Sequence, residues 1–116
     1  MDRQEALSSC ASRHAAVEDY PFGDDVAVFK VGGKVFAIVA LDGEPGRVTL
    51  KCDPEWALEL RAEYAAVQPG YHTNKRHWNT VTLDGSVDPT DINDMIRHSY
   101  DLVVAGLTRK QRSQLG

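Results

Sequence analysis

A polar segment in the second half of the chain carries the side chains best suited to binding chemistry. Residues 71–79 read YHTNKRHWN, which places cationic, aromatic and amide side chains in close succession. Lys75 and Arg76 could contact phosphates. Three aromatic side chains could stack on unpaired bases: Tyr71, His77 and Trp78. This combination is typical of a surface that binds nucleic acid, and it predicts binding without catalysis.

The other polar side chains of this segment have two interpretations. Asn74 and Asn79 could hydrogen-bond to base edges or sugar oxygens, and His72 is a further candidate contact to nucleic acid. Alternatively, His72 and Asn74 could satisfy the backbone of a turn, and Trp78 could anchor the core at the start of a strand. The sequence leaves both interpretations open.

The charge of this region differs from that of the whole chain. The 116 residues contain 13 Lys and Arg against 17 Asp and Glu, a formal net charge of -4, yet residues 64–83 contain no acid. An acidic chain does not bind nucleic acid strongly through net charge. Four to six phosphate contacts would give a salt slope of roughly -4 to -5. We therefore expect a monomer to bind DNA weakly and with strong salt sensitivity.

Two further lysines could extend the basic surface across a predicted hairpin. Lys30 and Lys34 flank Gly32-Gly33, which separates two runs rich in β-branched and aromatic residues. A two-residue turn at these glycines would place the two lysines on opposite sides of the sheet. Arg47 and Lys51 could extend the same surface. Solvated strand-surface charges are the favoured explanation for all four cations, although Lys30 and Lys34 stay among the candidate nucleic-acid contacts.

The elements that must position these residues follow from hydrophobic periodicity and from turn residues. Apolar spacings of three and four predict the helices, alternation predicts the strands, and Asp-Pro pairs predict two helix starts. The basic tail that begins at Thr108 is expected to be frayed. The expected helices are 2–18, 54–64 and 89–106, and the expected strands are 26–31, 34–41, 47–52 and 79–83.

Short turns between consecutive strands predict an antiparallel sheet, so the fold class is α+β, a two-layer sandwich with helices on one face. In the expected hairpin register Phe29 faces Phe36, and these rings share one sheet face with Ala27 and Ile38. In the third strand, the alternation of Arg47, Thr49 and Lys51 with apolar residues predicts a sheet with one wet face.

The bulk composition sets the remaining expectations. A chain of 116 residues fits a single domain, 1–116. No apolar stretch approaches the ~20 residues of a membrane span, and the polar N-terminus does not resemble a secretory signal. We therefore expect a cytoplasmic protein without membrane contact. Cys10 and Cys52 are expected as free thiols, and the spacing of the two excludes cysteine-based zinc motifs.

Several long blocks of the sequence resemble the MmcQ/YjbR family. They are VFKVGGKVFAIVAL, LKCDPE followed by ALELR, PGYHTNKRHWNTV with LDG, and SYDLVV in the last predicted helix. The resemblance covers nearly the whole chain in order. It implies a CyaY-like (frataxin-like) α/β sandwich and a small bacterial protein. Members are commonly labelled DNA-binding, through a proposed double-wing arrangement.

The frataxin-like resemblance also suggests a second function. Frataxin-like proteins bind iron at an acidic ridge on the first helix and the neighbouring strand. In this chain Glu18, Asp19, Asp24 and Asp25 cluster in the corresponding stretch, and carboxylate oxygens suit hard cations. Fold analogy is a weak warrant, so iron binding ranks below DNA binding. A third alternative is a protein–protein adaptor. No cofactor is predicted.

Overall fold

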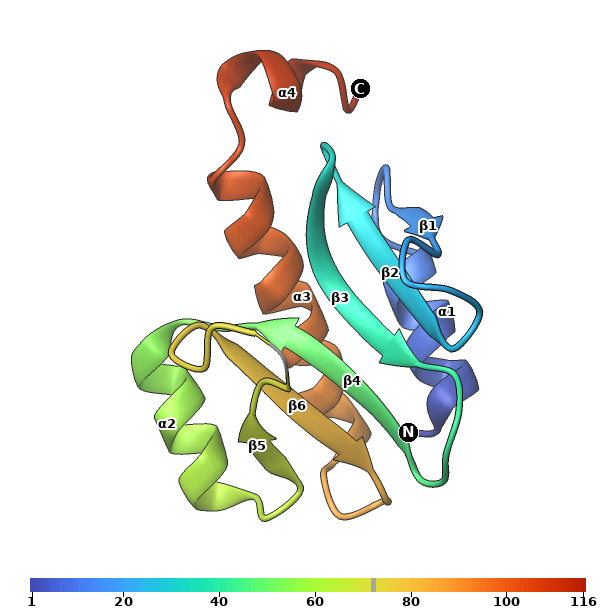
Figure 1. Ribbon diagram of the computed structural model, residues 1–116. Helices are drawn as coiled ribbons and strands as arrows, with labels where there is room; N and C mark the ends of the chain where they lie inside the picture. Colours follow the sequence, from blue (N-terminus) through green and yellow to red (C-terminus); the bar gives the residue numbers. More distant parts are fainter. Residues whose placement is uncertain (72) are drawn as a thin grey trace.

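The computed structural model describes residues 1–71 and 73–116 (Figure 1). Six strands form one antiparallel sheet in the order β1-β2-β3-β4-β6-β5. The strands are β1 Val17–Asp19, β2 Val26–Val31, β3 Lys34–Ala40, β4 Gly46–Lys51, β5 Val67–Pro69 and β6 Trp78–Leu83. The helices are α1 Arg3–Ala11, α2 Pro54–Glu63, α3 Pro89–Ala105 and α4 Arg109–Ser113. The predicted α+β class is confirmed.

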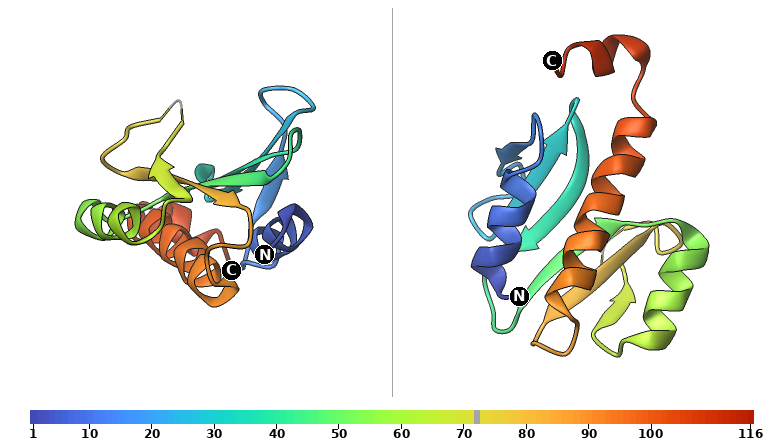
Figure 2. Two further views of the ribbon diagram at one scale, coloured as in Figure 1. Left: turned by 90° about the horizontal axis from the view of Figure 1, so that it is seen from below. Right: turned by 180° about the vertical axis from the view of Figure 1, so that it is seen from behind.

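Helices α1, α2 and α3 lie on the same side of the sheet (Figure 2). The apolar side chains of this side form one core cluster, which is shared by all three helices and includes Phe29, Val48, Ile92 and Ile96. Val48 and Leu50 of β4 belong to this core cluster. Arg47, the residue before Val48, is exposed. The predicted packing of helices on one face is therefore confirmed. The predicted wet face is confirmed only at Arg47, because Thr49 on the same face is 7% exposed.

The predicted starts of α2 and α3 are also confirmed. Asp53 and Asp88 cap these helices by accepting hydrogen bonds from backbone N–H groups of the first turn, and a proline follows each of them. Each carboxylate satisfies N–H groups that have no partner within the helix, while the proline has no N–H to satisfy.

The first helix is shorter than predicted. It was expected over residues 2–18, but α1 ends at Ala11, and Val17–Asp19 form the edge strand β1 against β2. Between them, Ala15 adopts a positive φ of 60°, which a continuing helix does not allow. The chain changes direction at Ala15, so that Val17 pairs with Lys30 and Asp19 pairs with Val28. Apolar spacing alone did not reveal this long-range pairing.

The hairpin register is correct at the turn and wrong beyond it. Val31 pairs with Lys34 and Lys30 with Val35, but the register then shifts so that Phe29 pairs with Ala37 instead of Phe36. Phe36 is the additional residue of a β-bulge. One additional residue reverses the face to which each later side chain of the same strand points.

Because of this bulge, Phe36 and Ala37 both contact the helix-side core, and Ile38 lines the opposite face. The predicted grouping of Ile38 with Phe29 and Phe36 is therefore wrong. The Phe36 ring packs edge-on against Tyr100 of α3, with ring centroids 5.4 Å apart. This contact keeps Phe36 on the helix side in spite of the shift.

Two short elements lie where turns or fraying were expected. Gln68-Pro69-Gly70 has the residues of a turn, but Val67–Pro69 pairs with β6 as the edge strand β5. The tail was predicted to be frayed, but it forms α4, where Thr108 and Gln111 make a reciprocal capping box. His14 contacts the tail through hydrogen bonds of 3.0 Å between Nε2 and the carbonyls of Leu115 and Gly116.

Candidate nucleic-acid interface on the open sheet face

The sheet face without helices, here called the open face, is turned toward the viewer in Figure 1. Side chains alternate between the two faces along each strand. On β4 the open face receives Arg47, Thr49 and Lys51, and cross-strand pairing places Thr82, Thr80 and Trp78 of β6 beside them. On β3 it receives Ile38 and Ala40, the partners of Thr49 and Arg47.

A groove of about 490 Å³ crosses this face. Its floor is formed by strand residues that include Ile38, Thr49 and Thr80, and its lining also includes Phe22 and Tyr71. Phe22 precedes β2 and is 74% exposed, while Tyr71 follows β5 and is 66% exposed. The first view of Figure 2 shows the segments around these two residues rising from the sheet on the side away from the helices.

The groove floor is held by a hydroxyl pair. Thr49 and Thr80 are buried and hydrogen-bond to each other at 2.8 Å between their Oγ1 atoms. Thr80 Oγ1 also accepts the backbone N–H of Tyr71 at 3.1 Å. This second bond fixes the backbone of Tyr71 on the floor, so the position of Tyr71 follows from the sheet.

The polar segment predicted from the sequence folds back toward the sheet. The N–H of Gly70 donates to the carbonyl of Trp78 at 2.8 Å, and Lys75 Nζ donates to the carbonyl of Gly70 at 3.1 Å. Asn74 Oδ1 accepts the backbone N–H of Arg76 at 3.0 Å, the turn-stabilising role that was one of its two interpretations. His72 lies outside the described residues.

Lys75 and Arg76 do not line the groove. They border a separate hollow of about 430 Å³ beside α2, together with Leu58 and Arg61. Arg61 joins α2 to this segment, because its guanidinium donates to Asn79 Oδ1 at 2.7 Å and also to the carbonyl of Lys75. Both cations are exposed, so they remain available to a ligand.

The remaining members of the segment have mixed environments. Trp78 is half-buried at the start of β6, where it pairs with Lys51 on the open face. The carbonyl of His77 accepts the N–H of Cys52 at 2.7 Å. Asn79 is 3% exposed, and its amide donates to the carbonyl of Ala57 at 3.3 Å. Asn79 therefore serves the fold and is not a surface contact.

Lys30 and Lys34 lie apart from the polar segment. Both belong to the β2–β3 hairpin, and β2 is separated from β6 by β3 and β4, a distance of about 14 Å at ordinary strand spacing. Lys30 Nζ pairs with Asp19 Oδ2 at 3.2 Å. Lys34 is exposed beside the turn. The structure therefore does not join the basic candidates into one contiguous cluster.

The acidic stretch proposed for iron has other partners. The Asp19 carboxylate is paired with Lys30, whose hydrogen bond lowers the pKa of Asp19. Glu18 accepts a hydrogen bond from the Tyr20 hydroxyl. Across residues 1–71 and 73–116, no three His, Cys, Asp or Glu side chains are grouped closely enough to hold a metal ion.

Sequence reasoning did not identify the groove. Arg47 and Lys51 were considered as an extension of the basic surface, with solvated strand charges favoured, and they share the open face with the groove and with Trp78. Phe22 stands in the stretch Tyr20-Pro21-Phe22-Gly23, whose proline and glycine indicate only the end of the first predicted helix. An aromatic residue in a polar turn segment was the available signal, since a turn does not itself require a large apolar side chain.

No helix within the described part of the chain is long and apolar enough to cross a membrane.

Comparison with known proteins supports the same fold. The crystal structure of DR2400 from Deinococcus radiodurans, a DUF419 domain, superposes with a TM-score of 0.92 at 39% identity, covering 99% of this chain and 88% of that chain. A Pseudomonas syringae protein superposes with a TM-score of 0.77 at 28% identity, covering 89% of this chain and 99% of that chain.

Sequence relatives agree with the structural ones. Uncharacterized protein YbdF of Escherichia coli O157:H7 is 37% identical over 97 residues, covering 83% of this chain and 79% of that protein. Uncharacterized protein YjbR of Escherichia coli strain K12 is 33% identical over 115 residues, covering 99% of this chain and 98% of that protein. The model of the family described as YjbR matches residues 11–102. This chain therefore belongs to the YjbR family, as its sequence blocks predicted.

Proposed function

We propose that the open face binds single-stranded DNA, weakly and without catalysis. The observation that carries the proposal is the groove on this face, which has the exposed aromatic side chains of Phe22 and Tyr71 in its lining. Bases stack on aromatic side chains in proteins that bind single strands, with little dependence on sequence. A double helix hides the faces of its bases, so the proposal favours single strands over duplex DNA.

Cationic side chains in and around the groove supply phosphate contacts. Arg47 lines the groove and Lys51 lies on the open face beside Trp78, while Lys75 and Arg76 are exposed in the separate hollow beside α2. The acid Asp42 also lines the groove and opposes the binding of phosphates. Three to four phosphate contacts by a chain of net charge -4 predict weak affinity and a salt slope of about -2 to -3.

The decisive test is fluorescence anisotropy with labelled single-stranded and duplex oligonucleotides at low and moderate salt. Wild-type protein should bind the single strand more tightly than the duplex. The double substitution Phe22→Ala with Tyr71→Ala should weaken binding by at least about tenfold, because stacking contributes on the order of 1–3 kcal/mol per base. The double substitution Arg47→Gln with Lys51→Gln should make the salt slope shallower by about 1.4.

The matched control removes the same two charges elsewhere. Arg109→Gln with Lys110→Gln alters two exposed cations of α4 and leaves the open face intact. This variant should retain most of the affinity. The proposal is wrong if no binding appears at low salt with protein concentrations of about 0.1 mM. It is also wrong if the α4 variant and the Arg47/Lys51 variant lose affinity equally, since binding would then follow net charge alone.

A further inference from the structure

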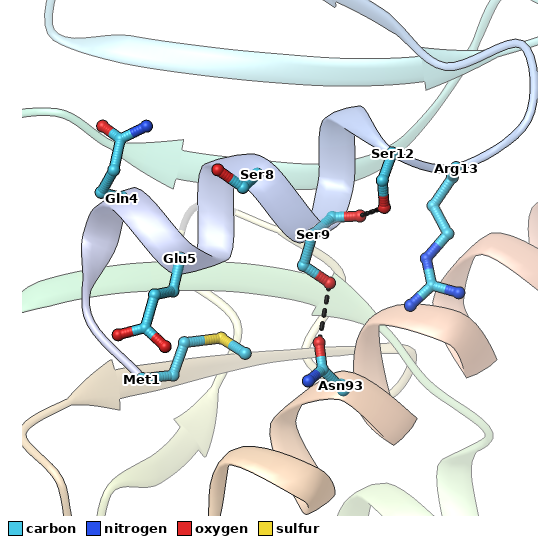
Figure 3. A pocket seen from close by; sticks show the side chains of 8 residues that line it. All are labelled: Met1, Gln4, Glu5, Ser8, Ser9, Ser12, Arg13 and Asn93. Carbon is cyan, nitrogen blue, oxygen red and sulfur yellow. Dashed lines mark hydrogen bonds between the residues drawn. The ribbon is translucent and has the colours of Figure 1, made fainter.

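A polar groove between α1 and α3 lies on the helix side of the sheet, away from the open face. Its volume is about 540 Å³, and its lining includes Ser8, Arg13 and Gln4 near α1 and Asn93 of α3. Figure 3 shows the Arg13 guanidinium and the Asn93 amide projecting toward the space between the two helices. This groove has no part in the proposed binding of DNA.

Arg13 is the unusual member of this groove. Its Nε is buried and has no hydrogen-bond partner within residues 1–71 and 73–116. None of the ion pairs in this described part of the chain includes Arg13. A guanidinium stays charged and carries five N–H donors, so a desolvated donor without an acceptor is costly. The end of the same guanidinium projects into the groove in Figure 3, so its other N–H groups can meet an ion or ligand there.

The neighbouring polar groups offer further donors. Ser9 Oγ donates to Asn93 Oδ1 at 2.8 Å, which occupies the amide oxygen and leaves the amide N–H groups of Asn93 for a ligand. The Ser8 hydroxyl is exposed on the same helix. The acid Glu5 also lines the groove, but Figure 3 shows it beside Met1, at the end away from Arg13. The Arg13 end therefore presents donors rather than acceptors.

We propose that this groove binds a phosphate monoester, with the phosphoryl group between Arg13 and Asn93. The planar fork of an arginine matches two phosphoryl oxygens, and the third oxygen can accept from the Asn93 amide. A carboxylate has only two oxygens and satisfies fewer of these donors. The groove volume leaves space for a small organic group attached to the phosphate.

A role without a ligand makes a different prediction. Arg13 follows α1 by two residues, and a cation near a helix C-terminus is favourable because of the helix dipole. That interaction would stabilise the fold, but it would not create saturable binding of phosphate. Binding measurements therefore separate the two roles.

The experiment is an NMR titration of backbone amides with inorganic phosphate and, in a second arm, with glycerol phosphate at constant ionic strength. Both should produce saturable shifts at residues 8–13 and at Asn93, with a dissociation constant on the order of 1 mM. Arg13→Gln should weaken binding by at least about tenfold, because charge-assisted hydrogen bonds are among the strongest. Asn93→Asp alters an exposed side chain, keeps Arg13, and should also weaken binding because it places a negative charge in the groove.

The control Arg109→Gln removes a cation from α4 and should leave both titrations unchanged. Tighter binding of glycerol phosphate than of inorganic phosphate supports an organic monoester. Binding of inorganic phosphate alone, equal binding of acetate, or shifts that do not saturate would each overturn the proposal. Unchanged binding in Arg13→Gln would do the same. Because the groove and the open face share no residues, these outcomes are independent of the DNA experiment.

Discussion

Two consecutive glycines form the β2–β3 turn, and they differ in what a side chain would meet there. Gly32 has φ +59°, and a Cβ on it would lie 2.6 Å from Leu107 Cδ1. Gly33 has φ +80°, but a Cβ on it would meet no atom within 4 Å. Leu107 is 4% exposed, so its side chain has little freedom to move away. The tail after α3 therefore constrains the turn through a single leucine.

We expect Gly32→Ala to destabilise the protein more than Gly33→Ala. Both substitutions force a left-handed residue, at about 1–2 kcal/mol. Only Gly32→Ala adds overpacking against Leu107, at about 1–3 kcal/mol more. Chemical denaturation of both variants measures the difference. Equal losses of unfolding free energy would show that Leu107 does not confine the turn.

A single buried serine connects α3 to two strands. Ser99 is 0% exposed, its hydroxyl donates to the carbonyl of Phe36 at 2.6 Å, and its Oγ accepts the N–H of Lys51 at 2.9 Å. The regular pairing of β3 with β4 extends only as far as Ala37 and Leu50. Ser99 therefore satisfies backbone groups that lie just beyond the end of this ladder.

Ser99→Ala should lower the free energy of unfolding by about 2–3 kcal/mol, because it leaves a buried carbonyl and a buried N–H without their partner. Ser113→Ala provides the comparison, since its exposed hydroxyl bonds only to the carbonyl of Lys110 within α4. That change should cost less than about 0.5 kcal/mol. Urea denaturation decides the matter, and a loss at Ser99 no larger than that at Ser113 would contradict it.

At the level of elements, a histidine joins α3 to the start of α2. His98 Nε2 accepts the backbone N–H of Asp53 at 3.1 Å, and the His98 ring packs edge-on against Trp56 at 4.6 Å between centroids. Burial lowers the pKa of His98 below its ordinary value of 6.5, although Asp53 and Asp101 act in the opposite direction. The neutral ring is the form that this junction requires.

The stability of the protein should therefore fall as the pH drops below about 6.5. The unfolded chain takes up a proton on His98 first, so the contribution is complete above that pH and is lost as the pH falls toward the folded pKa. Urea denaturation between about pH 8 and pH 5 should show this slope, and His98→Gln should flatten it. Asp19 and Asp84 have lowered pKa values and act only near and below 3.8, outside this window. An unchanged slope in His98→Gln would exclude this role.

Elements defined by local signals could be predicted, whereas those defined by distant partners could not. The Gly32-Gly33 turn and the Asp-Pro starts of α2 and α3 follow from backbone preferences of neighbouring residues. Strand β1 exists because Val17–Asp19 meets β2, and the bulge at Phe36 exists where the core on α3 receives its ring. Neither the strand β1 nor the bulge at Phe36 can be predicted from a short window of sequence.

At the level of the whole molecule, both cysteines are free thiols buried on the helix side of the sheet, as the sequence predicted. Burial raises the pKa of Cys10 to about 12 and that of Cys52 to about 11. Cys10 belongs to α1, and Cys52 follows β4. The two thiols therefore report on opening in different parts of the same core.

Neither thiol should react rapidly with a thiol reagent in native conditions, because the thiolate is the reactive form and burial disfavours it. In denaturant both should react, with the same dependence of rate on denaturant concentration if residues 1–116 unfold as one unit. The variants Cys10→Ala and Cys52→Ala assign each rate to its thiol. Two different denaturant dependences would contradict a single cooperative domain.

The distribution of charge in space also belongs to this scale. The acid-free stretch 64–83 contributes Tyr71 and Thr80 to the groove, but its cations Lys75 and Arg76 lie beside α2. Of the side chains that the sequence put forward in this stretch, Tyr71 lines the groove, whereas Lys75 and Arg76 do not. Sequence proximity reports which residues share a segment, whereas the turn at Asn74 decides the direction in which each side chain points.

The sequence by itself determined the fold class, the helices α2 and α3 and the central strands, because these depend on periodicity and turn chemistry in adjacent residues. It also determined membership of the YjbR family, through the resemblance of long blocks of sequence. Only the tertiary structure decided the two grooves. Phe22 and Tyr71 are 49 positions apart in the chain, and Ile38 and Thr80 are 42 positions apart. Arg13 and Asn93 are farther apart still. Sheet order and helix packing bring these residues together, and the spacing of neighbouring residues predicts neither of them.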